Sequence, residues 1–372
     1  MADNGETAMN PIGLYIHVPF CVKKCGYCDF YSVVGDDNLM DAYTAAVCEK
    51  IGDYKDKITA DTLYFGGGTP SVLGGNRVAM IINAACDMLT ADAEITVEAN
   101  PGDDLDDFFK RCRDAGVNRL SLGLQSANDN ELALLTRRHN RNDVVTAVNL
   151  ARKNGIDNIS LDLMLGTEAQ TKESLFRSVD FCADMGATHV SAYMLKIEEG
   201  TPFATRKFET PLADDDNVAE LYLATIDRLS EKGYAQYEIS NFAKNGAYSR
   251  HNLKYWNCDE YIGIGPSAHS FFKGKRFYYD RDINGFICGM DTVLDCDGGD
   301  FEEYVMLRLR LCDGLRRDLV INRFKNGNEL YDHVLSRTGK AASAGCLTAN
   351  NEKIALTSKG FLISNSVICD LI

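Results

Sequence analysis

The feature that most constrains this chain is a regular alternation. From residue 14 to about residue 245, short β-branched or apolar runs alternate with longer stretches of helical character. Such alternation predicts an α/β fold of repeated βα units with a parallel sheet. Six units are too few to close an eight-stranded barrel, so we expect a curved, partial (β/α)6 TIM-like barrel, with a doubly wound open sheet as the alternative. The six expected strands are 14–17, 62–65, 95–98, 119–124, 159–163 and 190–195.

The segments between and after these strands have the length and composition of helices. The expected helices are 38–57, 77–89, 105–115, 128–136, 142–154, 172–185 and 214–232. Beyond residue 245 the pattern changes to a segment rich in glycine, aromatic residues and histidine, and helical periodicity returns at 301–312. We therefore expect a barrel domain over 1–245 and a small, mainly helical, winged-helix-like domain over 246–372.

Composition excludes several classes of protein. A net charge of −15 argues against a nucleic-acid partner, because binding to phosphates needs clustered Lys and Arg. The start, MADNGETAMN, is unlike a signal peptide, and no long uncharged apolar run is present, so we expect a cytoplasmic protein with at most peripheral membrane contact. Ten of the 13 cysteines are scattered singly, which is typical of thiols in a reducing compartment rather than of a disulfide scaffold.

The other three cysteines follow the first expected strand, in YIHVPFCVKKCGYCDFYS. Cys21, Cys25 and Cys28 have the spacing Cys-x3-Cys-x2-Cys. A structural zinc site needs four protein ligands, and His17 is the candidate for the fourth, although zinc sites normally pair two CxxC-like halves across a longer gap. Three thiolates can instead hold an iron–sulfur cluster in which one iron stays open to another ligand. The spacing favours the cluster, and structural zinc is the alternative.

Further unusual residues stand where the other expected strands end. The segment Gly66–Thr69 follows the second strand, Glu98 the third and Gln125 the fourth, and Asp162 lies near the end of the fifth. The carboxyl ends of parallel strands meet at one rim, so these residues should form one site with the cysteines. Glycine allows close approach of the backbone to a ligand, and an acidic residue after a strand suits ribose hydroxyls. A carboxylate within the apolar run around Asp162 needs a partner.

The cysteine spacing, with the aromatic Tyr27 before the third cysteine, resembles the signature of the radical S-adenosylmethionine (SAM) superfamily. The resemblance implies that the three cysteines bind a 4Fe-4S cluster, and that the amino and carboxylate groups of SAM chelate its remaining iron. One-electron transfer then cleaves SAM to methionine and a 5'-deoxyadenosyl radical. The residues that the resemblance assigns to SAM binding are Tyr15, Tyr27, Gly67, Gly68, Thr69, Glu98, Gln125, Arg137 and Asp162.

Six motifs in order make the resemblance more specific. The cysteine segment with YFGGGTPS, EANPG, LGLQS, LTRRHN and HNLKYWN resembles the group that contains oxygen-independent coproporphyrinogen III oxidases and HemW-type heme chaperones. The oxidases carry a fourth cysteine where this chain has Phe30, and a long extension before the first strand, where this chain has about a dozen residues. The resemblance therefore favours a chaperone that binds heme and transfers it to acceptor proteins; the alternative is oxidative decarboxylation of coproporphyrinogen III.

The resemblance also suggests a heme contact. His251 lies in HNLKYW, which matches a HNxxYW motif associated with heme in the chaperones, and His269 is a second candidate. The alternative is a hydrogen-bonded histidine in an interdomain turn, with Tyr255 and Trp256 in the core. The implied partners are heme or a porphyrin, an acceptor protein and a reductant of the flavodoxin or ferredoxin type.

One segment departs from the family pattern. Residues 166–171 read Gly-Thr-Glu-Ala-Gln-Thr where the family has Gly-Leu-Pro-Gly-Gln-Thr. Without the proline, we expect a less rigid loop over the cofactor.

Overall fold

The structure is a computed structural model that describes residues 10–209 and 212–372. Its centre is a sheet of six parallel strands that pair in chain order, which confirms the expected α/β fold. Each expected strand coincides with an observed one. The strands are β1 (Ile12–Val18), β2 (Ala60–Gly67), β3 (Leu89–Ala99), β4 (Arg119–Gln125), β5 (Asn158–Leu165) and β6 (His189–Met194).

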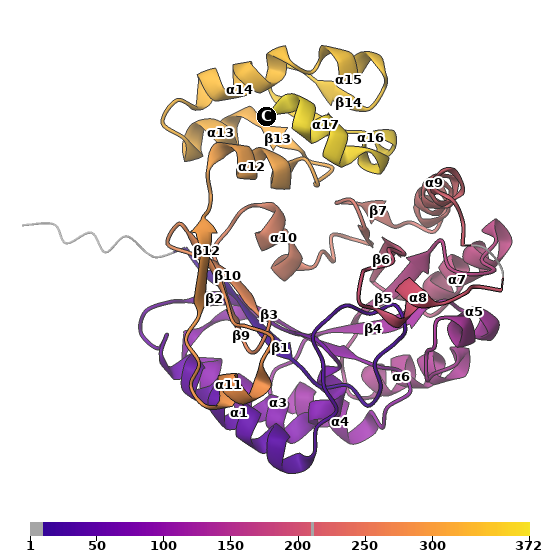
Figure 1. The fold of residues 1–372 in the computed structure, drawn as a ribbon, viewed down its shortest axis with the longest axis vertical. Helices are drawn as coiled ribbons and strands as arrows, with labels where there is room; N and C mark the ends of the chain where they lie inside the picture. Colours follow the sequence, from indigo (N-terminus) through magenta and orange to yellow (C-terminus); the bar gives the residue numbers. More distant parts are fainter. Residues whose placement is uncertain (1–9, 210–211) are drawn as a thin grey trace, which may run out of the picture.

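Helices connect these strands and cover the outer face of the curved sheet (Figure 1). Side-chain caps fix where several begin: Asn140 and Thr171 form capping boxes at the starts of α6 and α7. The helices of this region are α1 (Asp37–Gly52), α2 (Pro70–Leu73), α3 (Gly75–Ala85), the 3-10 turn η1 (Cys86–Met88), α4 (Asp106–Asp114), α5 (Asp129–Leu134), α6 (Arg141–Lys153), α7 (Lys172–Asp184), α8 (Pro202–Thr205) and α9 (Asp215–Glu231).

The sheet extends beyond the six parallel strands at both edges and stays open. Its order is β12-β11-β10-β9-β1-β2-β3-β4-β5-β6-β8-β7, with β9 parallel to β1 and the outer strands antiparallel. The added elements are β7 (Ala235–Gln236), β8 (Asn241–Ala243), β9 (Tyr261–Ile264), β10 (His269–Phe272), β11 (Lys275–Tyr278) and β12 (Val293–Asp297), with helices α10 (Arg250–Trp256) and α11 (Ile283–Ile287) between them.

These edge strands follow the expected domain boundary near residue 245 but belong to the sheet of the first domain. Residues 261–297 belong to the same sheet as β1, so a cut at 245 would divide that sheet. The strands escaped prediction because the glycine, aromatic and histidine residues of this segment show no clear period of two. The C-terminal elements outside this sheet start with α12 (Phe301–Arg308).

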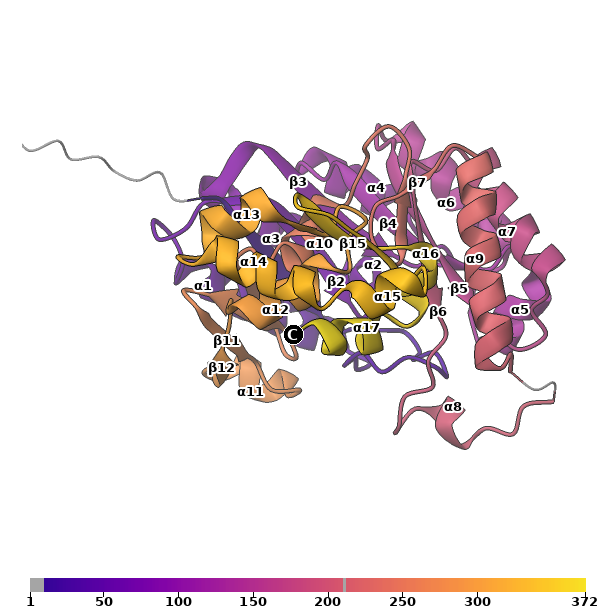
Figure 2. The same cartoon turned by 90° about the horizontal axis from the view of Figure 1, so that it is seen from above.

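The C-terminal unit is mainly helical, with a small sheet in the order β13-β15-β14, as expected for a winged-helix-like module. It lies over the sheet in the view from above (Figure 2). Backbone hydrogen bonds join it to the barrel, from Ile239 N to Arg310 O and from Cys312 N to Tyr237 O. Its elements are α12, β13 (Leu315–Arg316), α13 (Arg317–Arg323), α14 (Gly327–Ser336), α15 (Gly339–Ser343), β14 (Leu347–Ala349), β15 (Lys353–Leu356), α16 (Ser358–Leu362) and α17 (Ser364–Leu371).

The two faces of the parallel strands differ sharply in chemistry. Alternate residues of each strand are apolar and buried in the main core beneath the helices, such as Leu14, Leu63 and Val97. The other residues face the inside of the curve and are largely polar. They include Tyr15, His17, Tyr64, Glu94, Thr96, Glu98, Arg119, Ser121, Ser160, Asp162, His189 and Ser191. This polar inner face is where the candidate site lies.

Candidate functional site

The three clustered cysteines lie on the loop that follows β1. Their thiols are free and half-buried, and Cys28 N donates to Cys25 O at 3.2 Å. The base of the loop is closed by Cys21 N to Val33 O at 3.0 Å and by Val33 N to Pro19 O at 2.8 Å. Burial is the main cause that raises the pKa of the Cys28 thiol, and the neighbouring Cys25 and Cys21 raise it further. Three thiols therefore lie close together on one well-anchored loop.

The geometry of this loop does not support a structural zinc site. Within 10–209 and 212–372, no three His, Cys, Asp or Glu side chains converge on one point as a single metal ion requires. The suggested fourth ligand, His17, is buried, with Nδ1 bonded to Tyr15 OH at 3.1 Å and Nε2 to Tyr31 O at 3.0 Å. Burial lowers the His17 pKa to about 4. Three thiolates are a donor set that can hold an iron–sulfur cluster with one iron open, whereas structural zinc takes four protein ligands.

The glycine-rich turn after β2 packs directly against the cysteine loop. Gly68 N donates to Val18 O at 2.8 Å, and Thr69 N donates to Phe20 O at 2.7 Å. The Thr69 hydroxyl lies 3.3 Å from Cys21 Sγ. A Cβ on Gly67, whose φ is +104°, would lie 2.5 Å from the His17 ring, and one on Gly68 would lie 2.6 Å from Phe20 O. The glycines are thus required for the turn to support the loop, a packing reason that the sequence did not reveal.

Two carboxylates, one from β3 and one from β5 on the other side of β4, face the same interior. Glu98 Oε1 accepts a hydrogen bond from Tyr64 OH at 2.8 Å, and Asp162 accepts bonds of 3.2 and 3.3 Å from the Ser121 hydroxyl. Burial is the main cause that raises the pKa of both groups, that of Glu98 to about 7. Both carboxylates retain acceptor capacity for a ligand, because each oxygen offers more lone pairs than these bonds use.

Arg137 connects the cysteine loop to the end of β4. Its Nη1 lies 3.5 Å from both Cys25 Sγ and Tyr27 OH, and its Nη2 donates to Gly123 O at 3.0 Å. Its Nε is buried without a partner among the described residues. An orphaned donor of an always-charged group next to three thiols suits an anionic ligand group such as a carboxylate.

Gln125 has a strained backbone at the same place. Its φ is 65°, in the left-handed region that non-glycine residues rarely adopt. Its Nε2 lies close to Gly123, whose added Cβ would be 2.9 Å from both that nitrogen and Arg137 Nη2. Backbone strain of this kind is common at functional sites. Here the left-handed conformation turns the polar side chain of Gln125 inward at the end of β4.

His251, the expected heme contact, is enclosed and hydrogen-bonded in this structure. The residue lies on α10 and is 1% exposed. Its Nδ1 is bonded to the Thr62 hydroxyl and its Nε2 to Tyr255 OH, each at 2.8 Å, so both ring nitrogens already have partners within the protein. The ring stacks on Tyr64 at 5.3 Å and on Tyr15 at 6.3 Å, and burial lowers its pKa to about 3. The alternative of a hydrogen-bonded interior histidine describes this arrangement, whereas His269 is exposed.

His251→Ala should therefore reduce stability and leave the iron environment of bound heme unchanged. Loss of two buried hydrogen bonds and of ring packing should lower the free energy of unfolding by about 2 to 4 kcal/mol, measured by chemical denaturation. His269→Ala is the control, and it should change stability little. A changed absorption spectrum of bound heme in the His251 variant alone would show that α10 opens and that the histidine reaches the iron.

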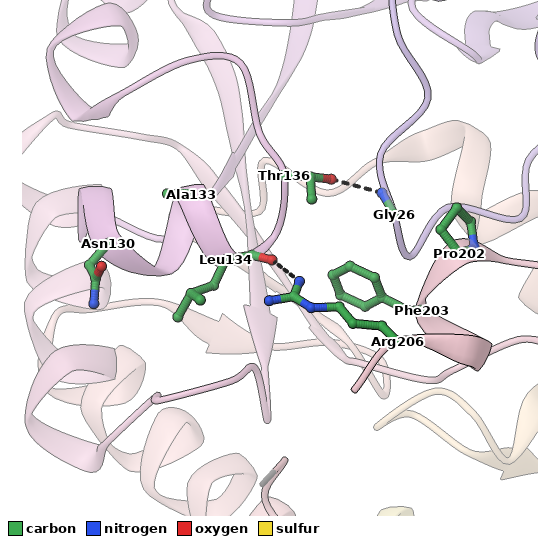
Figure 3. A pocket seen from close by; sticks show the side chains of 8 residues that line it. All are labelled: Gly26, Asn130, Ala133, Leu134, Thr136, Pro202, Phe203 and Arg206. Atoms are coloured by element: carbon green, nitrogen blue, oxygen red, sulfur yellow. Dashed lines mark hydrogen bonds between the residues drawn. The ribbon is translucent and has the colours of Figure 1, made fainter. Parts of the chain in front are cut away.

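A cavity of about 530 Å³ lies next to the cysteine loop, where the sequence did not predict one (Figure 3). Thr136 Oγ1 accepts a bond from Gly26 N at 2.8 Å, and Phe203 N donates to Gly26 O at 2.9 Å. Arg206 Nη1 donates to Leu134 O at 2.6 Å. These bonds hold the middle of the loop between α5 and α8. The residues that line the cavity are Gly26, Asn130, Ala133, Leu134, Thr136, Pro202, Phe203 and Arg206.

The loop without the family proline is held in another way. Gln170 Oε1 accepts from Gly166 N at 2.7 Å, and its Nε2 donates to Met164 O at 2.9 Å. Arg206 pairs with the buried Glu168 at 2.7 Å. Side-chain bonds therefore connect this segment to its surroundings, and whether it is less rigid than in the family stays a prediction.

The fold and the site together define a class of protein. The model of the radical SAM superfamily matches residues 15–182. The solved structure of coproporphyrinogen III oxidase (HemN) from Escherichia coli is similar with a TM-score of 0.82 and 20% identity, covering 97% of this chain and 90% of that one. This likeness shows the fold: the partial barrel with its three-cysteine loop is of the radical SAM type.

Curated relatives narrow the class to one family. The heme chaperone HemW of Mycobacterium tuberculosis (strain ATCC 25618 / H37Rv) is 35% identical, covering 97% of this chain and 95% of the relative. The heme chaperone HemW of Escherichia coli (strain K12) is 34% identical, covering 96% and 97%. The chain belongs to the HemW heme chaperone family. None of the helices in the described ranges has both the length and the apolar composition of a membrane span.

Proposed function

We propose that this protein is a SAM-binding 4Fe-4S heme chaperone, which binds heme and transfers it to acceptor proteins. One observation carries the proposal: three free thiols, the orphaned donor of Arg137 and the carboxylates of Glu98 and Asp162 all belong to one end of the polar inner face. The family name of the curated relatives supports heme as the cargo.

In this proposal Cys21, Cys25 and Cys28 hold the cluster, and SAM occupies its remaining iron. When bound, the cluster supplies one electron to SAM. The protein contributes orientation and shielding: the turn at Gly68 and Thr69 fixes the position of Cys21, and the hydrogen bonds of Gly26 fix the middle of the loop. Phe30, 64% exposed, stands where the related oxidases carry a further cysteine, so no fourth thiolate competes with SAM.

We assign the SAM contacts by chemistry. Glu98 accepts hydrogen bonds from the ribose hydroxyls, and Arg137 pairs with the methionyl carboxylate. The backbone at Gly67 receives the amino group. The remaining candidates lie around these groups on the inner face or the cysteine loop: Tyr15, Tyr27, Gly68, Thr69, Gln125 and Asp162.

The partners follow from this function: heme or a related porphyrin, a heme-requiring acceptor protein, and a reductant of the flavodoxin or ferredoxin type. The protein is prepared without oxygen, and its cluster is reconstituted. We expect stoichiometric heme uptake followed by transfer to apomyoglobin as a test acceptor, measured by absorption spectroscopy. The same preparation with SAM and coproporphyrinogen III should give no vinyl product by mass spectrometry. Formation of the divinyl product would replace the chaperone with the oxidase.

A further inference from the structure

Arg119 carries a buried charge that the structure leaves without a partner. It is the first residue of β4, it is 2% exposed, and it is the largest of the fully buried side chains in the described residues. Its Nε has no hydrogen-bond partner, and within the described ranges its guanidinium forms no ion pair with a carboxylate. An uncompensated charge in a protein interior is strongly unfavourable. Its place in the fold should therefore show what the charge does.

Strand pairing places this guanidinium just beneath the two carboxylates of the candidate site. Arg119 pairs with Thr96 of β3, and the next inward residue of β4, Ser121, pairs with Glu98. The Ser121 hydroxyl is itself bonded to Asp162 of β5. Arg119 thus lies on the same face as both carboxylates, one step closer to the start of the strands. Burial is the main cause that raises the pKa of both carboxylates. The hydrogen bond from Tyr64 to Glu98 and those from serine hydroxyls to Asp162 lower these pKa values, and the charge of Arg119 adds a smaller effect in the same direction.

The other groups around Arg119 do not replace its charge. The two nearby histidines, His189 and His251, are buried and neutral because burial lowers the pKa of each well below its usual range. The charge of Arg137, which lies beside the cysteine loop, also lowers the pKa of Asp162, with an effect no larger than that of Arg119. The titratable groups that face this part of the interior are Tyr15 of β1, Tyr64 of β2, Glu94 and Glu98 of β3, Asp162 of β5, His189 and Tyr193 of β6, His251 and Tyr255 of α10 and Tyr237 after β7.

We propose that Arg119 is a positioning residue for the SAM site, whose buried charge keeps Glu98 and Asp162 ionised so that they can accept hydrogen bonds from the nucleoside. This inference rests on the proposed function for the identity of the ligand. An ionised carboxylate is purely an acceptor and can take both ribose hydroxyls, whereas a protonated one gives up part of that capacity.

The direction of the pH effect follows from the position of Glu98. Its pKa is about 7 in the protein without ligand, so proton uptake competes with SAM near neutral pH. SAM binds the ionised form, so affinity is full above that pKa and falls as the pH drops through it. Removal of the Arg119 charge raises the pKa further and moves the fall in affinity to higher pH.

The test is the SAM affinity of reconstituted wild-type, Arg119→Gln and Arg119→Lys proteins from about pH 6.5 to about pH 9. A rise of one pKa unit predicts roughly a tenfold loss of affinity for Arg119→Gln near neutral pH and recovery at the alkaline end. Arg119→Lys keeps the charge and should retain the wild-type profile. An unchanged profile in Arg119→Gln, or a loss equal at every pH, would overturn the proposal. Should Arg119→Gln fail to hold a cluster, a shifted profile in Arg119→Lys overturns it and an unshifted one supports it.

A second measurement separates this inference from the assignment of SAM. The infrared carboxyl band of Glu98, identified by its loss in Glu98→Gln, reports protonation in the protein without SAM. It should titrate at higher pH in Arg119→Gln than in the wild type, and an identical titration would contradict the role of Arg119. If the wild-type protein binds no SAM, the proposed cofactor is wrong. The titration of Glu98 then still tests the role of Arg119 independently.

Discussion

Replacing Cys25 by alanine should leave the protein without its iron–sulfur cluster. The loop provides three thiolates, so the variant keeps only two ligands for the cluster. The neighbouring Thr69, Arg137 and Tyr27 offer no replacement thiolate. We expect anaerobic reconstitution of Cys25→Ala to yield almost no bound iron and sulfide, by chemical analysis and by loss of the brown absorption.

The matched control for this variant is Cys86→Ala. Cys86 is exposed at the end of α3, outside the cysteine loop, and its removal should leave the cluster content at the wild-type level. A full cluster in Cys25→Ala would contradict the ligand assignment. Stoichiometric zinc with no iron in the wild-type protein would show that the loop holds a structural zinc ion and not a cluster.

The second large effect is expected for Arg137→Gln, which should weaken SAM binding strongly while the cluster remains. The guanidinium is anchored to Gly123 and lies beside Cys25, so its free donor can pair with a carboxylate next to the cluster. Truncation of one partner of a buried charge pair costs about 2 to 5 kcal/mol, which is roughly a 30-fold to several-thousand-fold loss of affinity. Equilibrium titration of the reconstituted variant with SAM measures this loss.

The adjacent Arg138 provides the control. Its guanidinium pairs with Asp103 at 2.7 Å on the exposed side of the loop. Arg138→Gln removes the same charge one residue away and should change SAM affinity little, because exposed ion pairs contribute little and act over short range. Equal losses in the two variants would show that only net charge matters and that Arg137 makes no specific contact.

Local sequence patterns predicted the six parallel strands. Those strands in turn predicted that the site residues lie together at one rim of the sheet. Runs such as ISLDLML have the β-branched and apolar composition of buried strands, and the parallel connection forces their carboxyl ends together. Glu98, Gln125 and Asp162 could therefore be placed on one rim without knowledge of any contact. The glycines after β2 were also found, although their packing against His17 and Phe20 was not.

Other parts depend on contacts between residues far apart in the sequence. β9 is a strand because it pairs with β1, more than 240 residues earlier, and its short glycine-containing run carries no clear pattern of its own. His251 became buried because α10 packs beneath Tyr15 and Tyr64. From the sequence, Arg119 was only the first residue of an expected strand. Its burial was not predicted, because a charged residue at the end of an apolar run gives no indication that its side chain is buried.

The proposed function requires a cluster that keeps one iron for SAM. The decisive measurement is electron–nuclear double resonance of the reduced, reconstituted protein with SAM labelled isotopically at its amino nitrogen and carboxylate oxygens. The account predicts strong coupling of both labels to the cluster, which is lost in Cys25→Ala together with the cluster and weakened in Arg137→Gln. A reduced cluster that shows no coupling to either label in the presence of saturating SAM would contradict it.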